Sequence, residues 1–264
     1  MGATAQSRVW PPVCVSLLAF LATAFGPWLL GPPPADAIGV ATALDIRSVV
    51  HAGRSVAPRP SAPRRLAWEI RQRTSVETLL EPTDVRLDDP SLFDSPFVYW
   101  SGERSFEPLS DAEITGLRRF VEFGGFVLID DASPDQDGFD RSVRRALDRA
   151  FGEGALLPLP ANHTVYRSFY LLQRPYGRVE GPENLEAVER GGRAAVIYSR
   201  HDLGGAWDRD NLGNFRYPVQ PGGSGQRERA IRLGVNLVLY ALCLDYKDDQ
   251  VHSPIIMRRR AGQR

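Results

Sequence analysis

The sequence predicts an α/β fold, a three-layer sandwich in which an open and mostly parallel sheet carries helices on both faces. Two observations lead to this prediction. Short β-branched or apolar runs alternate with segments whose apolar residues recur at helical spacing, which is typical of β–α–β units. The run at residues 95–102 is also apolar on both faces, as expected of a parallel strand that helices cover from each side.

Strands are predicted where β-branched and apolar residues cluster between turn residues. The predicted strands are residues 43–51, 76–80, 95–102, 126–129, 155–159 and 193–199. The first alternates apolar and polar residues, and a polar, Asp-rich loop is expected between the second and the third. Residues 160–190 have a weak pattern rich in Gly, Pro and Tyr, which indicates an irregular insertion with room for one hairpin.

Helices are predicted where apolar residues recur every three to four positions. The predicted helices are residues 64–74, 110–123, 139–151 and 226–244. The second begins with Ser110 as N-cap and Glu113 at the third helical position, a capping box, and Gly124-Gly125 ends it. A Gly-rich loop is expected over residues 203–225.

The first part of the 264-residue chain is predicted to be an export signal. Arg8 precedes an apolar run at residues 13–30, and Ala35-Asp36-Ala37 matches a small-x-small cleavage site. The predicted domains are a signal peptide, an α/β domain and a polar tail, at residues 1–37, 38–248 and 249–264. We therefore expect a periplasmic or secreted protein. The alternative is an uncleaved N-terminal membrane anchor, because the run approaches the roughly 20 apolar residues that span a bilayer.

Charge and cysteine content narrow the classes of partner. The 32 basic and 32 acidic residues cancel, so no long-range field attracts nucleic acid or an anionic membrane. Nucleic acid is not expected as a partner, and a membrane is expected only through an uncleaved leader. Without the leader, Cys243 is the only cysteine, so no internal disulfide can form and the fold depends on its apolar core.

Polar residues follow three of the predicted strands at their ends. Because the carboxyl ends of parallel strands meet at one edge of a sheet, where α/β folds bind ligands, we expect these residues to line a ligand site. The expected ligand-binding residues are Ser101, Gly102, Asp130, Asp131, His201, Asp202 and Trp207. The alternative is that Asp130 and Asp131 hold the next turn by hydrogen bonds to backbone amides.

A catalytic interpretation of this edge uses Asp130, Asp131, His163 and His201 in a hydrolase that a metal ion could assist. No His-x-x-x-His, Cys-x-x-Cys or acidic calcium-loop spacing supports a metal site, so neither a metal nor another cofactor is expected. Gly-x-Ser-x-Gly is absent after the leader, and Cys243 lies within the last predicted helix as a core residue. A lone histidine in a loop is more often a structural hydrogen bonder than a general base.

Several of these segments, in this order, resemble a bacterial family called domain of unknown function 4159. The matching features are residues 97–102, the helix from Ser110 that enters the strand ending at Asp130-Asp131, the step at residues 162–166, the strand end at residues 196–202 with Trp207, and the closing helix around Asn236. The resemblance covers nearly all of residues 38–264. It implies a flavodoxin-like, class I glutamine amidotransferase-like architecture and a place among envelope-associated systems.

The resemblance does not imply amidotransferase activity. Class I amidotransferases use a nucleophilic Cys on a Gly-x-Cys-x-Gly elbow, and this chain has no cysteine at a predicted strand end. We therefore expect an exported, non-catalytic protein that binds a small ligand or an envelope partner, because a fold alone does not supply a function. Two alternatives stay open: the Asp/His hydrolase, and an envelope assembly protein that acts through surface contacts.

Overall fold

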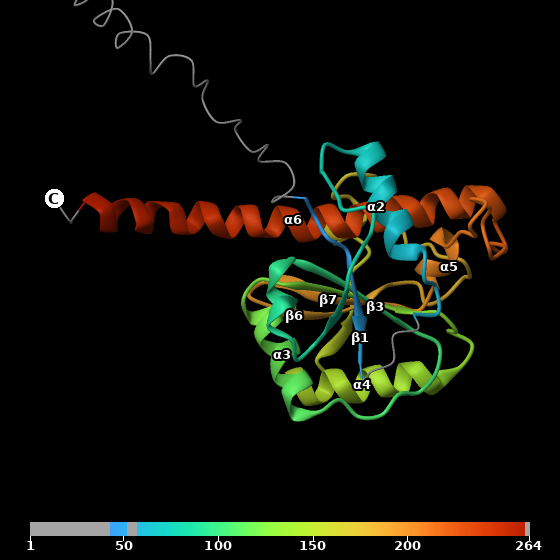
Figure 1. The fold of residues 1–264 in the computed structure, drawn as a ribbon, viewed down its shortest axis with the longest axis horizontal. Helices are drawn as coiled ribbons and strands as arrows, with labels where there is room; N and C mark the ends of the chain where they lie inside the picture. Colours follow the sequence, from blue (N-terminus) through green and yellow to red (C-terminus); the bar gives the residue numbers. More distant parts are fainter. Residues whose placement is uncertain (1–42, 52–56, 262–264) are drawn as a thin grey trace, which may run out of the picture. The chain divides into compact units, whose positions relative to one another are not determined.

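The computed structural model describes residues 43–51 and 57–261, except for the side chains of residues 244–261, and in this part of the chain seven strands form one sheet (Figure 1). The strands are β1 (Arg47–Val50), β2 (Asp84–Arg86), β3 (Phe97–Gly102), β4 (Phe126–Asp131), β5 (Leu156–Pro158), β6 (Glu186–Arg190) and β7 (Arg193–Ser199). Their order is β2-β1-β3-β4-β7-β6-β5. The first five in this order are parallel to one another, and β6 runs antiparallel to both of its neighbours. A mixed α/β fold with a largely parallel sheet is therefore confirmed.

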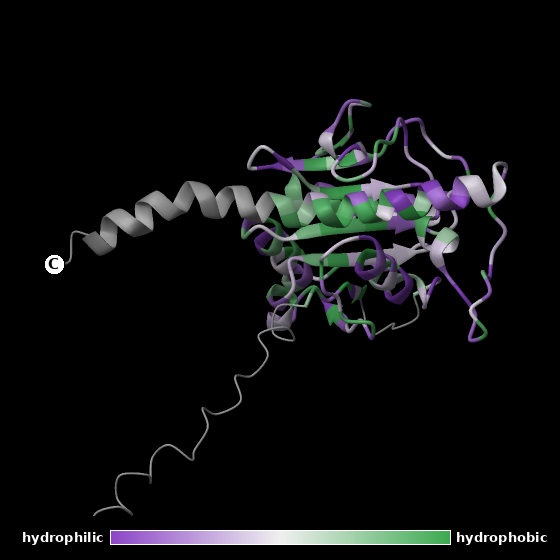
Figure 2. Ribbon diagram, turned by 90° about the horizontal axis from the view of Figure 1, so that it is seen from above, coloured by the Kyte–Doolittle hydropathy of each residue, from purple (hydrophilic) through white to green (hydrophobic). Residues whose placement is uncertain are grey.

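Helices cover both faces of the sheet (Figure 1). The helices are α2 (Ala62–Arg73), α3 (Asp111–Glu122), α4 (Asp137–Phe151), α5 (Leu203–Trp207) and α6 (Gly223–Ala261), with short 3-10 turns η1 (Pro90–Asp94) and η2 (Thr164–Tyr166). One apolar cluster joins α2, α5 and α6 to the sheet, and a second joins α3 and α4 to its other face. Figure 2 shows the hydrophobic residues concentrated in the strands and in the part of α6 that lies over them.

The turn into the central strand forms as the sequence predicts. The Ser110 Oγ accepts the Glu113 backbone N–H, and the Glu113 carboxylate accepts the Ser110 backbone N–H, which completes the capping box of α3. Gly124 has φ 104°, a left-handed conformation that side chains resist. The chain leaves α3 there and enters β4, whose six residues are all buried.

Two predicted strand and loop assignments in the first half are wrong. Residues 76–80 contain only an isolated bridge between Thr78 and Leu44, because the Thr78 hydroxyl donates to the Ala67 carbonyl of α2 instead of extending along the sheet. The second strand is β2, inside the predicted Asp-rich loop. Val85 alone of its three residues is buried, so the strand has little apolar signal.

The second half also differs from the sequence pattern at three places. The irregular insertion ends in β6, which forms a hairpin with β7 through Gly191 and Gly192, both at positive φ. The predicted Gly-rich loop begins with α5, whose first two amides are bound by the distant Asp130 and the third by its own N-cap, Asp202. The last helix, α6, starts earlier and ends later than residues 226–244.

The predicted leader at residues 1–37 lies outside the described residues. In the part of the chain that is described, no helix has the length and apolar content that crossing a membrane requires.

Candidate functional site

The polar residues at the ends of three parallel strands do meet at one edge of the sheet. Ser101 at the end of β3 lies beside Asp130 of β4, and Asp130 lies beside Ser199 of β7. Immediately after β7, the Asp202 backbone N–H donates to the Asp131 carbonyl oxygen at 3.1 Å. We call this region, residues 101–102, 130–131 and 199–202, the carboxyl edge.

Asp130 binds the beginning of α5 at this edge. Its carboxylate accepts the backbone N–H groups of Leu203 at 2.8 Å and Gly204 at 2.7 Å, and the Tyr99 hydroxyl at 2.9 Å. The side chain is fully buried. Burial and the nearby Asp202 carboxylate raise the pKa of Asp130 to about 7. Asp130 is therefore a backbone-holding carboxylate with no lone pair facing an open cavity.

Asp202 is the centre of a buried ion-pair group. Its two carboxylate oxygens lie 3.0 and 2.8 Å from Nε and Nη2 of Arg59, and the second also accepts from Arg178. The same carboxylate accepts the Gly205 backbone N–H at 2.9 Å. Asp202 is fully buried and has φ 50°, a backbone conformation that Asp tolerates better than most residues. The geometry joins three distant segments of the chain.

Asp131 faces the other side of the sheet and is also used internally. Its carboxylate accepts the Ser133 backbone N–H at 3.0 Å and the Tyr198 hydroxyl at 3.3 Å, with Nε of Arg200 at 4.0 Å. Burial raises the pKa of Asp131 to about 6. Arg200 is shared with Asp140 of α4, 3.7 Å away.

His201 is a buried hydrogen bonder. Its Nε2 lies 2.9 Å from the Pro182 carbonyl oxygen, so this nitrogen must carry the proton that it donates, and Nδ1 lies 3.4 Å from the Ser199 hydroxyl. Burial lowers the pKa of His201 to about 4. Both ring nitrogens are occupied, and the ring holds the loop that ends at Pro182.

His163 does not reach the carboxyl edge, so the four-residue catalytic arrangement is not assembled. Its ring lies 5.4 Å from that of Tyr240, whose hydroxyl accepts the Ala194 backbone N–H near the start of β7. Tyr240 also packs against Phe126 at the start of β4. His163 thus lies at the amino ends of the strands. There its Nδ1 accepts the Val165 backbone N–H, and burial lowers its pKa.

Trp207 and Gly102, both predicted to bind ligand, are packing residues. Trp207 is 1% exposed, donates from Nε1 to the Ala230 carbonyl of α6 at 3.1 Å, and lies beside Tyr99. At Gly102 an added Cβ would lie 2.1 Å from the Phe139 ring, so only glycine allows α4 to approach β3 this closely. Neither lines one of the two pockets described below.

Cavities open beside the carboxyl edge rather than within it. A pocket of about 480 Å³, the edge pocket, is lined by Pro134, Asp135, Arg178, Val179, Glu180, Gly181, Pro182 and Arg200. It shares Arg178 with the buried Asp202 group and Arg200 with Asp131. In residues 43–51 and 57–261 no three His, Cys, Asp or Glu side chains are grouped so that they could hold a metal ion.

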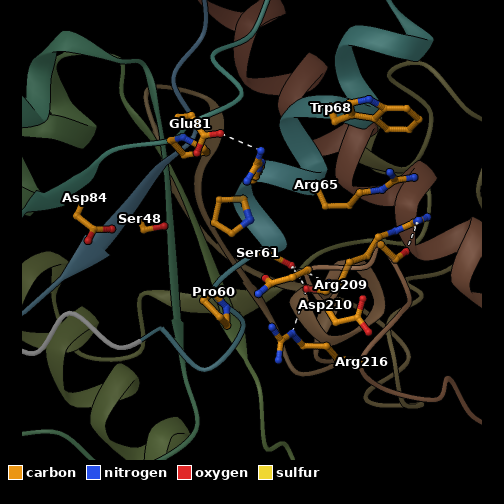
Figure 3. Close-up of a pocket in the computed structure, with 15 residues that line it drawn as sticks. Ser48, Pro60, Ser61, Arg65, Trp68, Glu81, Asp84, Arg209, Asp210 and Arg216 are labelled. Carbon is orange, nitrogen blue, oxygen red and sulfur yellow. Dashed lines mark hydrogen bonds and ion pairs between the residues drawn. The ribbon is translucent and has the colours of Figure 1, made fainter.

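A larger pocket of about 730 Å³, the α2 pocket, lies between α2, the β1–β2 side of the sheet and the loop after α5 (Figure 3). Its lining includes Arg64, Arg65 and Trp68 of α2, and Arg209 and Arg216 of the loop. Sequence reasoning pointed to this loop only in general terms and did not single out these arginines. Arginine is the common basic residue along the whole chain, so composition gives no local signal.

Sequence reasoning also missed Arg59 and Arg178, which neutralise Asp202. Arg59 is 143 residues away from Asp202 along the chain and lies in a Pro-rich segment that reads as a loop. No spacing rule links residues at such a separation.

Comparison with known proteins finds one family model that covers most of the chain. The model described as Domain of unknown function (DUF4159) matches residues 45–242. No curated protein gives a significant match to this sequence.

Proposed function

Because the chain belongs to the DUF4159 family, we propose that it is a non-catalytic binding protein of the cell envelope, with an amidotransferase-like α/β fold that takes a small polar ligand at the edge pocket. The parallel order β2-β1-β3-β4-β7 supports the flavodoxin-like part of this proposal, because doubly wound folds of that type arrange five strands in the same way. The signal-peptide pattern of residues 1–37 supports export.

The observation that carries the proposal is the internal use of three titratable side chains at the carboxyl edge. Asp130, Asp202 and His201 each bind backbone or arginine groups through all the atoms that acid–base or nucleophilic chemistry would need. A general base must reach a substrate proton with a free lone pair. The described cysteine, Cys243, is an exposed residue of α6 and not a strand-end nucleophile.

The edge pocket is the place where the same fold leaves room for a ligand. Ligands of open α/β sheets bind outside the carboxyl ends of the strands, and this pocket lies directly beyond β4 and β7. Arg178 and Arg200 border it, and the side chain of each is 24% exposed, so their remaining N–H donors can contact a polar ligand.

Native mass spectrometry of the full-length protein purified from its own envelope, with metal analysis of the same sample, tests this proposal. We expect a small-molecule adduct that is lost in Arg200→Gln and kept in Arg141→Gln, an exposed arginine of α4 that does not line the pocket. We also expect no ammonia release from glutamine. A retained stoichiometric metal, or hydrolytic activity that Asp131→Asn abolishes, would overturn the non-catalytic proposal. A co-purifying protein in place of the small molecule would favour the envelope assembly function.

A further inference from the structure

Two arginines that line the α2 pocket have buried N–H donors without an acceptor. In the described part of the chain, Nε of Arg65 and Nε of Arg209 are both inaccessible to solvent and make no hydrogen bond. Buried donors are nearly always satisfied in folded proteins, so an unsatisfied pair at one pocket calls for a partner.

The charge of Arg209 is also uncompensated. Among the described side chains, those of residues 43–51 and 57–243, no carboxylate lies within ion-pair distance of its guanidinium, which donates only to the Gly213 carbonyl, at 2.8 Å. Arg65 has a carboxylate partner, Glu69, but Glu69 also binds Arg73. Arg73 has a second carboxylate partner in Glu228, whereas Arg65 shares Glu69 with it and lies close enough to Arg209 to be repelled by its charge.

The positive charges of this region repel one another. Burial and repulsion from Arg209 lower the pKa of Arg65 despite its contact with Glu69, and they lower the pKa of Arg227 as well. Like charges held close together in a partly buried site destabilise the protein unless an opposite charge joins them. An anion placed among these groups would remove that repulsion.

Aromatic rings hold the guanidinium groups in fixed positions. Arg65 stacks on Trp68 at 4.0 Å from the ring centre, and Arg209 and Arg227 approach the Phe215 ring at 4.0 and 3.8 Å. Figure 3 shows the side chains of Arg65 and Arg209 ending on the same side of the pocket, near Trp68. Stacking of this kind leaves the N–H edge of a guanidinium free to bind an oxyanion.

The opposite end of the pocket is acidic. Glu81 pairs with Arg64 at 2.9 Å, and Asp84 lies at the exposed start of β2 (Figure 3). Asp210 lines the pocket next to Arg209, where its carboxylate accepts the backbone N–H groups of Leu212 and Asn214. Arg65, Arg209 and Arg216 outnumber it at that end, so a negatively charged group is better accommodated there than at the β2 end.

We propose that the α2 pocket is a second binding site, which takes the oxyanion group of a small ligand, a phosphate or a carboxylate, between Arg65 and Arg209. The site is separate from the edge pocket, since no residue lines both. An oxyanion bound between the two guanidinium groups compensates the charge of Arg209 through charge-assisted hydrogen bonds.

Isothermal titration of the full-length protein with pyrophosphate and with citrate, at constant ionic strength, tests this site. We expect the wild-type protein to bind at least one of them, and the preferred probe identifies the phosphate or the carboxylate as the recognised group. Arg209→Gln should weaken that binding by roughly tenfold or more, since it removes a charge-assisted hydrogen bond. Arg71→Gln, a charge-matched control on α2 outside the pocket, should leave binding within about twofold of wild type.

Two further measurements keep the outcome interpretable. Circular dichroism should show Arg209→Gln to be folded, because Arg209 has no ion pair to lose in the described residues. Arg200→Gln, in the edge pocket, should bind the probe as wild type does, which separates this site from the proposed function. Absence of binding of both probes to wild type, or equal binding by Arg209→Gln, would overturn the proposal.

Discussion

Two aspartates of the carboxyl edge and two arginines of the α2 pocket differ in how their buried polar atoms are satisfied. At the edge, Asp130 and Asp202 have every oxygen occupied by a backbone amide, a hydroxyl or an arginine. In the pocket, Arg65 and Arg209 keep buried donors with no acceptor in the described residues. Satisfied groups stabilise a fold, whereas two unsatisfied donors that border one pocket are the groups that a ligand could complete.

This difference makes the two regions separable by experiment. Substitution of Asp202 or Asp130 should lower the free energy of unfolding. Substitution of Arg209 should weaken ligand binding in the α2 pocket and leave the free energy of unfolding nearly unchanged. The predictions below test the contrast from the largest expected change in stability to the smallest.

Asp202→Asn should have the largest effect. The substitution keeps the shape and the tolerance for positive φ, but it leaves Arg59, 8% exposed, without its carboxylate. Breaking a buried ion pair in this way costs about 3–5 kcal/mol of unfolding free energy. Urea denaturation measures it, with Glu77→Gln as the control, because its ion pair with Arg71 is exposed and worth about 1 kcal/mol at most. Equal losses in the two variants would show that the edge is not a structural ion-pair group.

Asp130→Asn should lower the free energy of unfolding by about 2–3 kcal/mol, because an amide N–H₂ then faces the backbone donors of α5. The loss should depend on pH. The folded-state pKa of Asp130, about 7, exceeds the value of about 3.9 for an unfolded aspartate, so the folded protein binds this proton more tightly. The contribution of this bound proton to the free energy of unfolding is complete below pH 4 and is lost as the pH rises through 7.

The difference between wild type and Asp130→Asn should therefore be larger at pH 5 than at pH 8. Comparing the two proteins cancels the titration of other groups. His201 acts in the opposite sense, since its lowered pKa of about 4 makes the folded state lose stability as the pH falls from about 6.5. A difference that is constant with pH would show that the pKa of Asp130 is not raised.

The parts of this molecule that the sequence predicts are those decided by neighbours along the chain. The capping box at Ser110, the Gly124 turn and the buried strand β4 depend on local contacts and on apolar pattern, and they are confirmed. The α5 helix was missed because its first amides are bound by Asp130, more than 70 residues earlier in the chain.

The candidate site residues show the same limit on what the local sequence can predict. Parallel strands correctly place Asp130 and His201 at one edge, but the strand pattern does not say which face or partner each side chain takes. His163 was grouped with them although it lies at the amino ends of the strands, since the irregular segment that carries it has no periodicity to orient it. The unsatisfied arginines of the α2 pocket depend on segments that only the fold brings together.

Gly102→Ala should lower the free energy of unfolding by about 1–2 kcal/mol, because the new Cβ would overlap the Phe139 ring. Thermal unfolding measures the change. Gly225→Ala is the matched control, since its Cβ meets nothing within 4 Å and alanine favours the helix α6. If Gly102→Ala kept its stability but lost ligand binding, Gly102 would be a ligand-binding residue and not a packing residue.

Arg209→Gln should have the smallest effect on the free energy of unfolding, and this result would distinguish the α2 pocket most clearly from the carboxyl edge. The substitution removes a charge that has no ion-pair partner in the described residues and relieves repulsion on Arg65 and Arg227, at the cost of one hydrogen bond to Gly213. These opposing effects leave a change within about 0.5 kcal/mol in the absence of ligand. Pyrophosphate or citrate, whichever wild type binds, should raise the unfolding temperature of wild type and not of the variant, because a ligand stabilises only the protein that binds it. A loss of several kcal/mol without ligand would mean that Arg209 holds the fold as Asp202 does, and the distinction between the two regions would fail.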